Sequence, residues 1–445
     1  MRFVSCGVAG ERRRGHCFPT TVPETTNSER YRFAKFGDAW AACPALAQPF
    51  APNRSKSNAL PPSQLRSSRA RSRRVAPLIE DVFVCCTRTA SPEVQRAVAD
   101  RDAKSLVILL QASAIGARQS VASGIAILAD APPDQSTDPM REAFAAAGAF
   151  PPLVAMLRDG ATEERAAAAE ALWKLSRNAA VKAAIAAAGG IEPLVTLVRN
   201  GDAQGKANAA AALGNLACSN DANKAAIRSA GGIEPLVTLV RDGEAQGKAS
   251  AAYVLGSLAD GDDANKEAIM AAGGIKPLVT LVRNGDAQGK ADAAGALGIL
   301  ADGNDANKEA IRSAGGIEPL VALVRDGDAE GNPDAAYVLG NLADGDDANK
   351  EAIAAAGAIE PLVALVRDGD AKGKADAARA LGILADGNDA NKEAIRSAGG
   401  IEPLAALVRD GDAEGKADAA RALGILGIDS SPMESGFNGN ADSLL

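Results

Sequence analysis

The sequence repeats itself every 42 residues, and this period limits the fold more than any other feature. The stretch 274–315, GIKPLVTLVRNGDAQGKADAAGALGILADGNDANKEAIRSAG, returns with small changes along most of the chain. The proline of the I-[EK]-P-L motif marks the register at Pro193, Pro235, Pro277, Pro319, Pro361 and Pro403, and Pro152 precedes them by 41 residues. A period of about 40–47 residues with helical patterning is typical of a solenoid, whose units bury their apolar faces on one another.

Each unit is expected to contain three helices. In the example unit, 265–271 is a short helix that follows Asp262 and Asp263, whose side chains can cap its first N–H groups. This helix ends at a Gly-Gly pair, where a positive φ is easily reached. The next helix, 275–282, places apolar residues at i, i+3, i+4 and i+7 on one face, with its proline in the first turn, where proline is tolerated. The pattern predicts an all-α chain.

The third and longest helix of the unit is expected at about 286–301. At about 100° per residue, its apolar residues gather on one side and the others fall opposite. The apolar side, expected to be core, comprises Ala293, Ala294, Leu297, Leu300 and Ala301. The opposite side, expected to face outward, comprises Asp292, Gly295, Gly298, Ile299 and Asp302.

A short helix, a Gly-Gly turn, an I-P-L-V-x-L-V helix and a long A-x-A-L-x-x-L-A helix follow one another in seven consecutive units. This order resembles the armadillo repeat, and the resemblance covers about residues 90–428. HEAT repeats are the alternative, but they usually have two helices per unit, and three can be read here. The resemblance implies a right-handed α-solenoid with three helices per 42-residue unit.

The repeats divide the chain into four predicted parts. Residues 1–88 are read as a disordered basic arm, because they combine Pro, Ser and Arg without a sustained period. Residues 89–137 match the second and third helices loosely, as expected of a capping repeat with one face toward water. Residues 138–428 hold the seven full repeats, and 429–445 form a polar tail.

The charge is distributed unevenly between the arm and the repeats. Residues 1–75 carry a net charge of +10, so the remainder carries −18 of the total of −8. The arm fits an Arg- and Ser-rich transit peptide, or a nuclear localisation signal at Arg66–Arg74. It equally fits a solvated tail or a wrongly assigned start of the gene. A further hypothesis is that Arg66–Arg74 occupies the protein's own acidic groove and competes with partners.

The residues of the array argue against catalysis. The only histidine is His16, so imidazole-based nucleophilic catalysis and a His-containing zinc site are not expected in the repeats. The stretch 285–291 resembles a phosphate-binding loop, but its glycines are one residue too close, and Ala291 replaces the Ser or Thr that would hold magnesium. The loops 260–265 and 344–349 lack the register of a calcium loop. We expect no enzyme, no cofactor and no metal.

The cysteines and hydropathy bear on localisation. Of six cysteines, only Cys218 lies within the full repeats, so disulfides do not hold the units together and a reducing compartment fits. No apolar run approaches the ~18 residues that a membrane span needs. We therefore expect a cytoplasmic protein, or a nuclear one, without a membrane span, and organelle targeting by the arm stays open.

The outward row of the third helices is the candidate site, because in armadillo proteins this helix lines the concave groove that holds partners. The row is rich in carboxylates, among which stand tyrosine, asparagine and arginine. A solvated helix face is the plain alternative, although an aspartate at a helix C-terminus opposes the macrodipole by about 0.3–1 kcal/mol. The predicted groove residues are Asp260, Asp292, Asp302, Asp334, Asp344, Asp376, Asp386, Asp418, Tyr253, Tyr337, Asn215, Asn341, Arg379 and Arg421.

The nuclear-import receptor importin-α, an armadillo family, holds basic signals with Trp and Asn four residues apart on the third helix. The Trp positions correspond here to Glu170, Ala211, Tyr253, Gly295, Tyr337, Arg379 and Arg421, and two of the Asn positions keep Asn215 and Asn341. An import-type adaptor is therefore an alternative, as is a scaffold subunit of a ubiquitin ligase. The main interpretation is a non-enzymatic scaffold that binds a basic or extended protein segment in the acidic groove, with no nucleic acid bound by the array.

Overall fold

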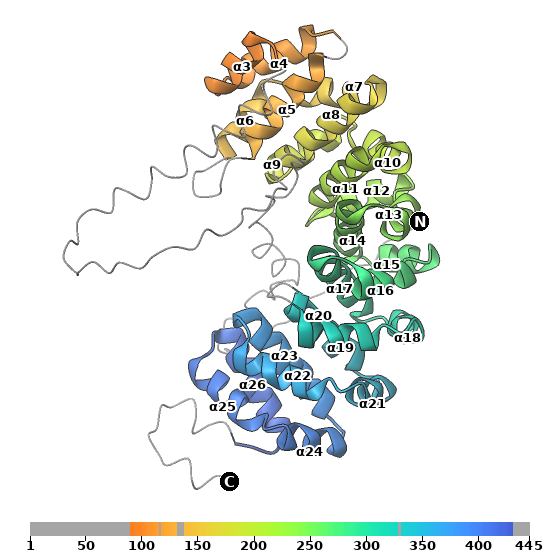
Figure 1. Ribbon diagram of the computed structural model, residues 1–445, viewed down its shortest axis with the longest axis vertical. Helices are drawn as coiled ribbons and strands as arrows, with labels where there is room; N and C mark the ends of the chain where they lie inside the picture. The colour runs from red at the N-terminus through yellow and green to blue at the C-terminus, as the bar shows by residue number, and fades with distance from the viewer. Residues whose placement is uncertain (1–89, 115–116, 131–137, 328–330, 430–445) are drawn as a thin grey trace, which may run out of the picture. The chain divides into compact units, whose positions relative to one another are not determined.

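The computed structural model describes residues 90–114, 117–130, 138–327 and 331–429, which belong to one compact unit, Ala59–Leu445. In these ranges the chain forms 24 α-helices and no β-strand (Figure 1). The predicted all-α repeat fold is thereby confirmed. The predicted basic arm and all but the first residue of the predicted polar tail lie outside the described residues.

The helices fall into eight groups of three. The first group is α3 (Pro92–Ala99), α4 (Ala103–Ala112) and α5 (Ala117–Ala129). In the other seven groups, the first helices are α6 (Asp138–Ala146), α9 (Ala179–Ala187), α12 (Asp221–Ser229), α15 (Asp263–Ala271), α18 (Asp305–Ser313), α21 (Asp347–Ala355) and α24 (Asp389–Ser397). The second helices are α7 (Phe150–Asp159), α10 (Ile191–Asn200), α13 (Ile233–Asp242), α16 (Ile275–Asn284), α19 (Ile317–Asp326), α22 (Ile359–Asp368) and α25 (Ile401–Asp410). The third helices are α8 (Thr162–Leu175), α11 (Ala203–Ala217), α14 (Ala245–Ala259), α17 (Ala287–Ala301), α20 (Gly331–Ala343), α23 (Ala371–Ala385) and α26 (Ala413–Ile425).

The helix ends form where the turn residues predict them. The carboxylate of Asp262 accepts a hydrogen bond of 2.9 Å from the backbone N–H of Asn265, which caps α15. After α15 the backbone of Gly273 has a φ of +72°, a conformation that costs an L-residue with a side chain more than it costs glycine. The N–H of Gly274 then bonds the carbonyl of Ile269 at 2.9 Å, satisfying a carbonyl of the last turn. Each capped break lets the next helix start in a new direction.

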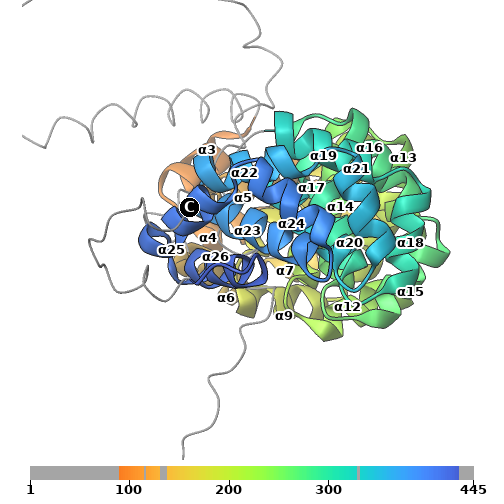
Figure 2. The same ribbon diagram turned by 90° about the horizontal axis from the view of Figure 1, so that it is seen from below.

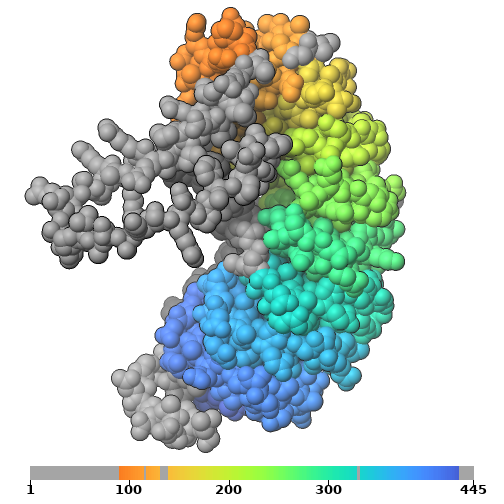
Figure 3. All heavy atoms as spheres, viewed as in Figure 1, coloured from red at the N-terminus to blue at the C-terminus, as the bar shows by residue number. Residues whose placement is uncertain are grey.

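The core is a continuous stack in which third helices pack against one another. α17 lies between α14 and α20, and its own second helix, α16, covers another side. Leu278, Leu297 and Leu300 are fully buried between these helices. Figure 3 shows the same order on the surface, since each stretch of the array adjoins those next to it in the sequence. Figures 1 and 2 both place α18 at the outer rim, and its contacts are with α16 and α17.

Candidate protein-binding surface

The aspartates that follow the third helices form a row of exposed carboxylates. Asp302, Asp344 and Asp386 are exposed, and Asp260 is half-buried. Asp260, Asp302 and Asp386 are the C-cap residues of α14, α17 and α23, and Asp344 directly follows α20. We call these four residues the carboxylate ladder. Because the third helices stack side by side, the ladder runs from unit to unit with one carboxylate in each.

Buried lysines hold the backbone beneath this ladder. The ammonium group of Lys266, on the first helix of one unit, donates to the backbone carbonyl of Asp302, at the end of the third helix of the same unit, at 2.7 Å. The same contact recurs along the array in the pairs Lys182–Cys218 (3.1 Å), Lys224–Asp260, Lys308–Asp344 (2.6 Å) and Lys350–Asp386 (2.8 Å). We call this contact the lysine clamp. It brings a positive charge to the negative end of each helix, which accounts for an aspartate at a terminus that otherwise disfavours anions.

The charges around the half-buried ladder member influence one another. Burial is the main cause that raises the pKa of the Asp260 carboxyl above its usual range. The nearby ammonium groups of Lys224 and Lys266 act in the opposite direction, whereas the carboxylate of Asp302 raises the pKa further. Neighbouring units are therefore linked electrostatically, and a cation placed between two ladder carboxylates would meet both.

The predicted aspartates in the first half of the third helices are less exposed than residues on a solvated helix face would be. The exposed fractions of Asp292, Asp334 and Asp376 are 6%, 4% and 5%, and Asp418 is half-buried. Asp334 forms an ion pair with Lys372 from the following unit. These aspartates were expected to be exposed. They are buried because each third helix packs between two others, so fewer of its side chains reach the surface than on an isolated helix.

The carboxylate of Asp334 favours the charged form of Lys372. Burial, the largest influence, acts to lower the pKa of the lysine. The attraction of Asp334, supported by Asp376 and Asp370, outweighs burial and raises the pKa above its usual value. Lys372 therefore neutralises part of the carboxylate row between α20 and α23.

Gly298 was expected to face outward, and the structure corrects this. A Cβ atom built on Gly298 would lie 2.8 Å from Cδ1 of Tyr337, on the next third helix. Gly340 and Gly382 occupy the same place in the following units, and the nearest neighbours of their Cβ positions are Ala380 and Ala422. Glycine at this position lets adjacent third helices approach closely, so it is part of the interface between units.

Three predicted groove residues meet in one cluster between α20 and α23. The guanidinium of Arg379 lies over the Tyr337 ring, 5.3 Å from its centroid, and donates to Oδ1 of Asn341 at 2.9 Å. Asn341 in turn donates to the carbonyl of Gly298 at 3.1 Å. Burial is the main cause that raises the pKa of Tyr337. The cluster ties three successive third helices together, so its side chains serve the fold whether or not they also touch a partner.

Asn215 has a similar structural role in an earlier unit. Its amide donates to the carbonyl of Trp173 and to the hydroxyl of Ser176, both at 3.2 Å. Asn215 is only 8% exposed, because it fills the contact between α8 and α11. The two asparagines that match the importin-α pattern therefore each bond a carbonyl of the preceding third helix.

Tyr253 gives a prediction for stability at alkaline pH. Burial, with a smaller effect from Cys218, raises the pKa of Tyr253 from 10 to about 12. Above about pH 10 an unfolded tyrosine ionises before the folded one, so ionisation favours the unfolded chain. Between about pH 9 and about pH 12, the wild type should lose about 2 kcal/mol more unfolding free energy than Tyr253→Phe. Urea denaturation of both proteins at the two pH values checks this, and equal losses would contradict it.

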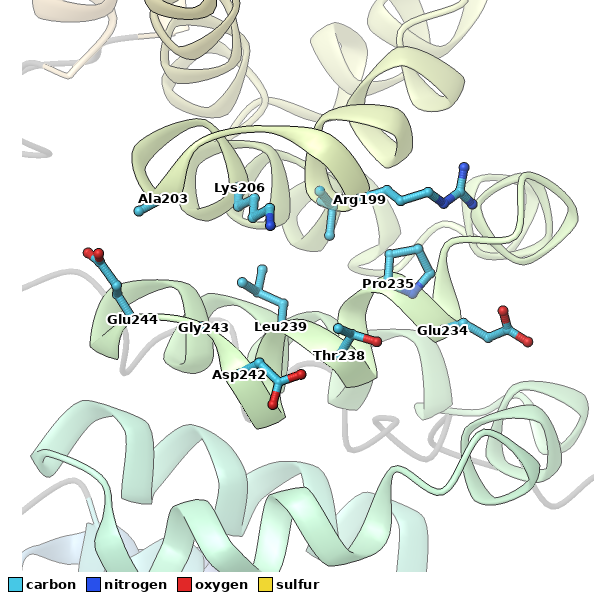
Figure 4. Close-up of a pocket in the computed structure, with 11 residues that line it drawn as sticks. Arg199, Ala203, Lys206, Glu234, Pro235, Thr238, Leu239, Asp242, Gly243 and Glu244 are labelled. Atoms are coloured by element: carbon cyan, nitrogen blue, oxygen red, sulfur yellow. The ribbon is translucent and has the colours of Figure 1, made fainter.

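A pocket of about 360 Å³ lies between the second helices α10 and α13 (Figure 4), and no ladder residue lines it. Its wall combines Lys206 and Arg199 from one unit with Glu234, Asp242 and Glu244 from the next. Since charges of both signs line it, the pocket offers no single class of ligand. No group of His, Cys, Asp or Glu in the described part of the chain is arranged to hold a metal ion. Within that part no single helix is long and apolar enough to cross a membrane, and only the bent pair α9 and α10 meets that test jointly.

The sequence interpretation missed the residues that hold the ladder in place. The clamp lysines were not singled out, although Asn-Lys recurs at 42-residue intervals from Asn223-Lys224 to Asn391-Lys392. The asparagine of the pair also has a structural role, since Asn307 donates to the carbonyl of Leu300 at 2.8 Å. The recurrence was a usable signal, but the clamp spans 36 residues, so no local pattern shows what the lysine reaches.

Comparisons with known proteins agree with the repeat geometry. The family model described as the armadillo/beta-catenin-like repeat matches residues 178–218, 262–302, 304–344, 346–386 and 388–426. The crystal structure of an engineered protein is 34% identical, with a TM-score of 0.67 over 80% of this chain and 86% of that one. A second engineered protein is 37% identical (TM-score 0.51; 53% and 96% covered), and a designed armadillo repeat protein is 26% identical (TM-score 0.50; 53% and 99% covered). No curated protein matches the chain.

Proposed function

Because the chain belongs to the armadillo repeat proteins, whose fold typically serves as a binding scaffold, we propose that it binds a segment of a partner protein and catalyses no reaction itself. The segment is extended and basic, and it lies along the carboxylate ladder. The proposal refines the predicted acidic groove, since it places the main contacts on the exposed aspartates and not on the buried row.

The observation that carries the proposal is the spacing of the exposed carboxylates along stacked helices. Helices in contact lie about 8–10 Å apart, and an extended chain advances about 3.3 Å per residue. A ligand running across the third helices would therefore meet a new ladder carboxylate at about every third residue. Lysine or arginine at that spacing gives each ladder member, from Asp260 to Asp386, a counter-charge.

The lysine clamp supports such a role because it organises the ladder before any partner binds. The clamp holds the backbone carbonyl of Asp302 and leaves the side-chain carboxylate exposed. The backbone under each carboxylate is thus fixed by a contact from the first helix of the same unit. A ligand that meets a preorganised row of charges loses less free energy to ordering the protein.

Removing the exposed ladder charges should weaken binding of a basic peptide by about tenfold. The variant is Asp302→Asn with Asp344→Asn and Asp386→Asn, and each exposed ion pair is worth about 0.2–1 kcal/mol. The probe is a fluorescent ten-residue peptide with lysine at every third position, measured by anisotropy at low salt. Wild-type affinity should also fall as salt is added, because exposed charges are screened.

A matched control carries the same change of net charge on another surface. Glu318→Gln, Glu360→Gln and Glu402→Gln alter three exposed residues on the second helices α19, α22 and α25. This variant should keep the wild-type affinity after the small effect of net charge is allowed for. Equal losses in the two triple variants would mean that the peptide senses only total charge, and the ladder would not be the binding surface.

A further inference from the structure

The carboxylate ladder stops one unit before the end of the array. Each ladder aspartate comes directly before a glycine with a positive φ, and these glycines are Gly261, Gly303, Gly345 and Gly387. α26 ends earlier, at Ile425, and the residue before its positive-φ glycine, Gly427, is Leu426. The next carboxylate in the chain, Asp429, follows this turn and does not precede it. The acidic row that a basic segment would follow therefore ends at Asp386 on α23.

Cationic side chains appear on the third helices where the ladder stops. The residues seven positions before the first three ladder aspartates are Tyr253, Gly295 and Tyr337, on α14, α17 and α20. On α23 and α26 the same position is occupied by Arg379 and Arg421. Since α23 and α26 pack against each other, the two arginines occupy adjacent places in this row. The row thus changes from neutral to positively charged between α20 and α23.

Arg379 is oriented by neutral groups and keeps one donor without an acceptor. Its guanidinium lies over the Tyr337 ring, and its Nη2 donates to the amide oxygen of Asn341 at 2.9 Å. The side chain as a whole is half-buried, but its Nη1 is covered and has no acceptor among the described residues. A covered donor without an acceptor is costly, and a new acceptor removes this cost. A carboxylate suits arginine well, because both groups are charged and their geometries match.

Arg421 is the more accessible of the two arginines. Its side chain is 51% exposed, and it forms an ion pair of 3.4 Å with Asp418, three residues earlier on the same helix. An exposed pair of this kind contributes little, because water and salt screen it. Arg421 therefore loses little when it exchanges Asp418 for a carboxylate of a ligand.

We propose that Arg379 and Arg421 bind an acidic end of the partner segment, an inference that rests on the proposed function. The basic part of the segment lies along the ladder, and the end that lies over α23 and α26 carries a carboxylate. This carboxylate belongs to an Asp or Glu side chain or to the C-terminus of the partner chain. The pattern fixes the direction of the segment along the array, since the reverse direction would bring its carboxylate toward Asp260 and Asp302.

The test compares two fluorescent peptides of identical composition, measured on the full chain by anisotropy at low salt. Both contain the ten-residue segment with lysine at every third position and have blocked ends. One carries two additional glutamates at its N-terminal end, and the other carries them at its C-terminal end. One of the two peptides should bind the wild type about fivefold more tightly than the other, because only one places its glutamates beside the arginines.

The variant that removes the site is Arg379→Gln with Arg421→Gln. It should abolish the difference between the two glutamate peptides and keep the affinity of the plain lysine peptide within about twofold. Arg421→Gln alone, which removes only an exposed ion pair, should reduce the difference if Arg379→Gln disturbs the contact with Tyr337. The matched control is Arg367→Gln with Arg409→Gln, two exposed residues on α22 and α25, which should preserve the difference.

A fourth peptide distinguishes the two sources of the carboxylate. It is the plain lysine peptide with a free C-terminus, and a gain in affinity that depends on the arginines would identify the chain terminus as sufficient. No gain, with a gain from glutamate, would identify an acidic side chain.

Two results would overturn the inference: equal affinity of the two glutamate peptides for the wild type, or a difference that the double arginine variant retains. The proposed function is tested separately by the plain peptide and the triple ladder variant. Equal glutamate peptides, together with ladder-dependent binding of the plain peptide, would remove the arginine site and leave the proposed function standing. A plain peptide that does not bind would overturn both.

Discussion

Deleting residues 305–346 should leave a folded array, whereas deleting only 305–325 should abolish cooperative folding. The longer deletion removes one period and joins Asn304 to Asp347. Asn304 caps α18 through the N–H of Asn307 at 3.0 Å, as Asp346 caps α21 through Asn349 at 2.9 Å, so the new junction keeps a cap. α17 would then pack on α23 through Gly298, as α20 packs there now through Gly340.

The shorter deletion removes α18 and nearly all of α19 while leaving α20 in place. α19 contributes five buried apolar side chains: Ile317, Leu320, Val321, Leu323 and Val324. At about 1.5–3 kcal/mol each, their loss amounts to about 10 kcal/mol, comparable with the whole stability of a typical domain at about 5–15 kcal/mol. Circular dichroism and urea unfolding distinguish the outcomes. If both deletions are equally helical and cooperative, the 42-residue unit is not the unit of stability.

Placing a leucine side chain at Gly298 should destabilise the protein by about 3 kcal/mol. Its Cβ atom would already lie 2.8 Å from the ring of Tyr337, and a leucine adds three more carbons to a closely packed contact. Gly298→Leu would therefore force α17 and α20 apart. Urea denaturation measures the loss, and part of it should return when Tyr337→Ala is added to make room.

Gly424→Leu provides the control for this prediction at the equivalent position of the last unit. No atom lies within 4 Å of its built Cβ, so only the gain in helix propensity applies. The expected result is a change between zero and a gain of about 1 kcal/mol. A similar loss at both positions would mean that leucine disturbs the helix itself, and the contact between α17 and α20 would not be the cause.

Much of the local structure could be predicted because the signals are close together in the sequence. The period placed the helices, and Asp262 and Gly273 act as the cap and turn residues that they were expected to be. The positions of the ladder aspartates could be read in the same way, since each follows the last turn of a third helix. These features depend on residues a few positions apart.

The division of the candidate residues into exposed and buried rows could not be predicted in this way. Asp302 and Asp292 lie on the same side of a single ideal helix, yet Asp302 is exposed and Asp292 is buried, with only 6% of its surface exposed. Asp302 is the C-cap residue beyond the end of α17, whereas Asp292 lies inside that helix, which packs against α14 and α20. A helical projection of one unit contains no information about its neighbours.

By itself the sequence determined the period, the three helices of each unit, their caps and the apolar faces, because hydrogen bonds and side-chain spacing within a helix are local. The tertiary structure alone decided which surfaces remain open. The clamp from Lys266 to Asp302 crosses 36 residues, and the closure of Gly298 against Tyr337 crosses 39. Gly424 and Gly382 share nine residues of identical context, yet one is open and the other covered. Whether a residue is buried depends on the neighbouring helices of the stack, so the same sequence is covered inside the array and open in its last unit.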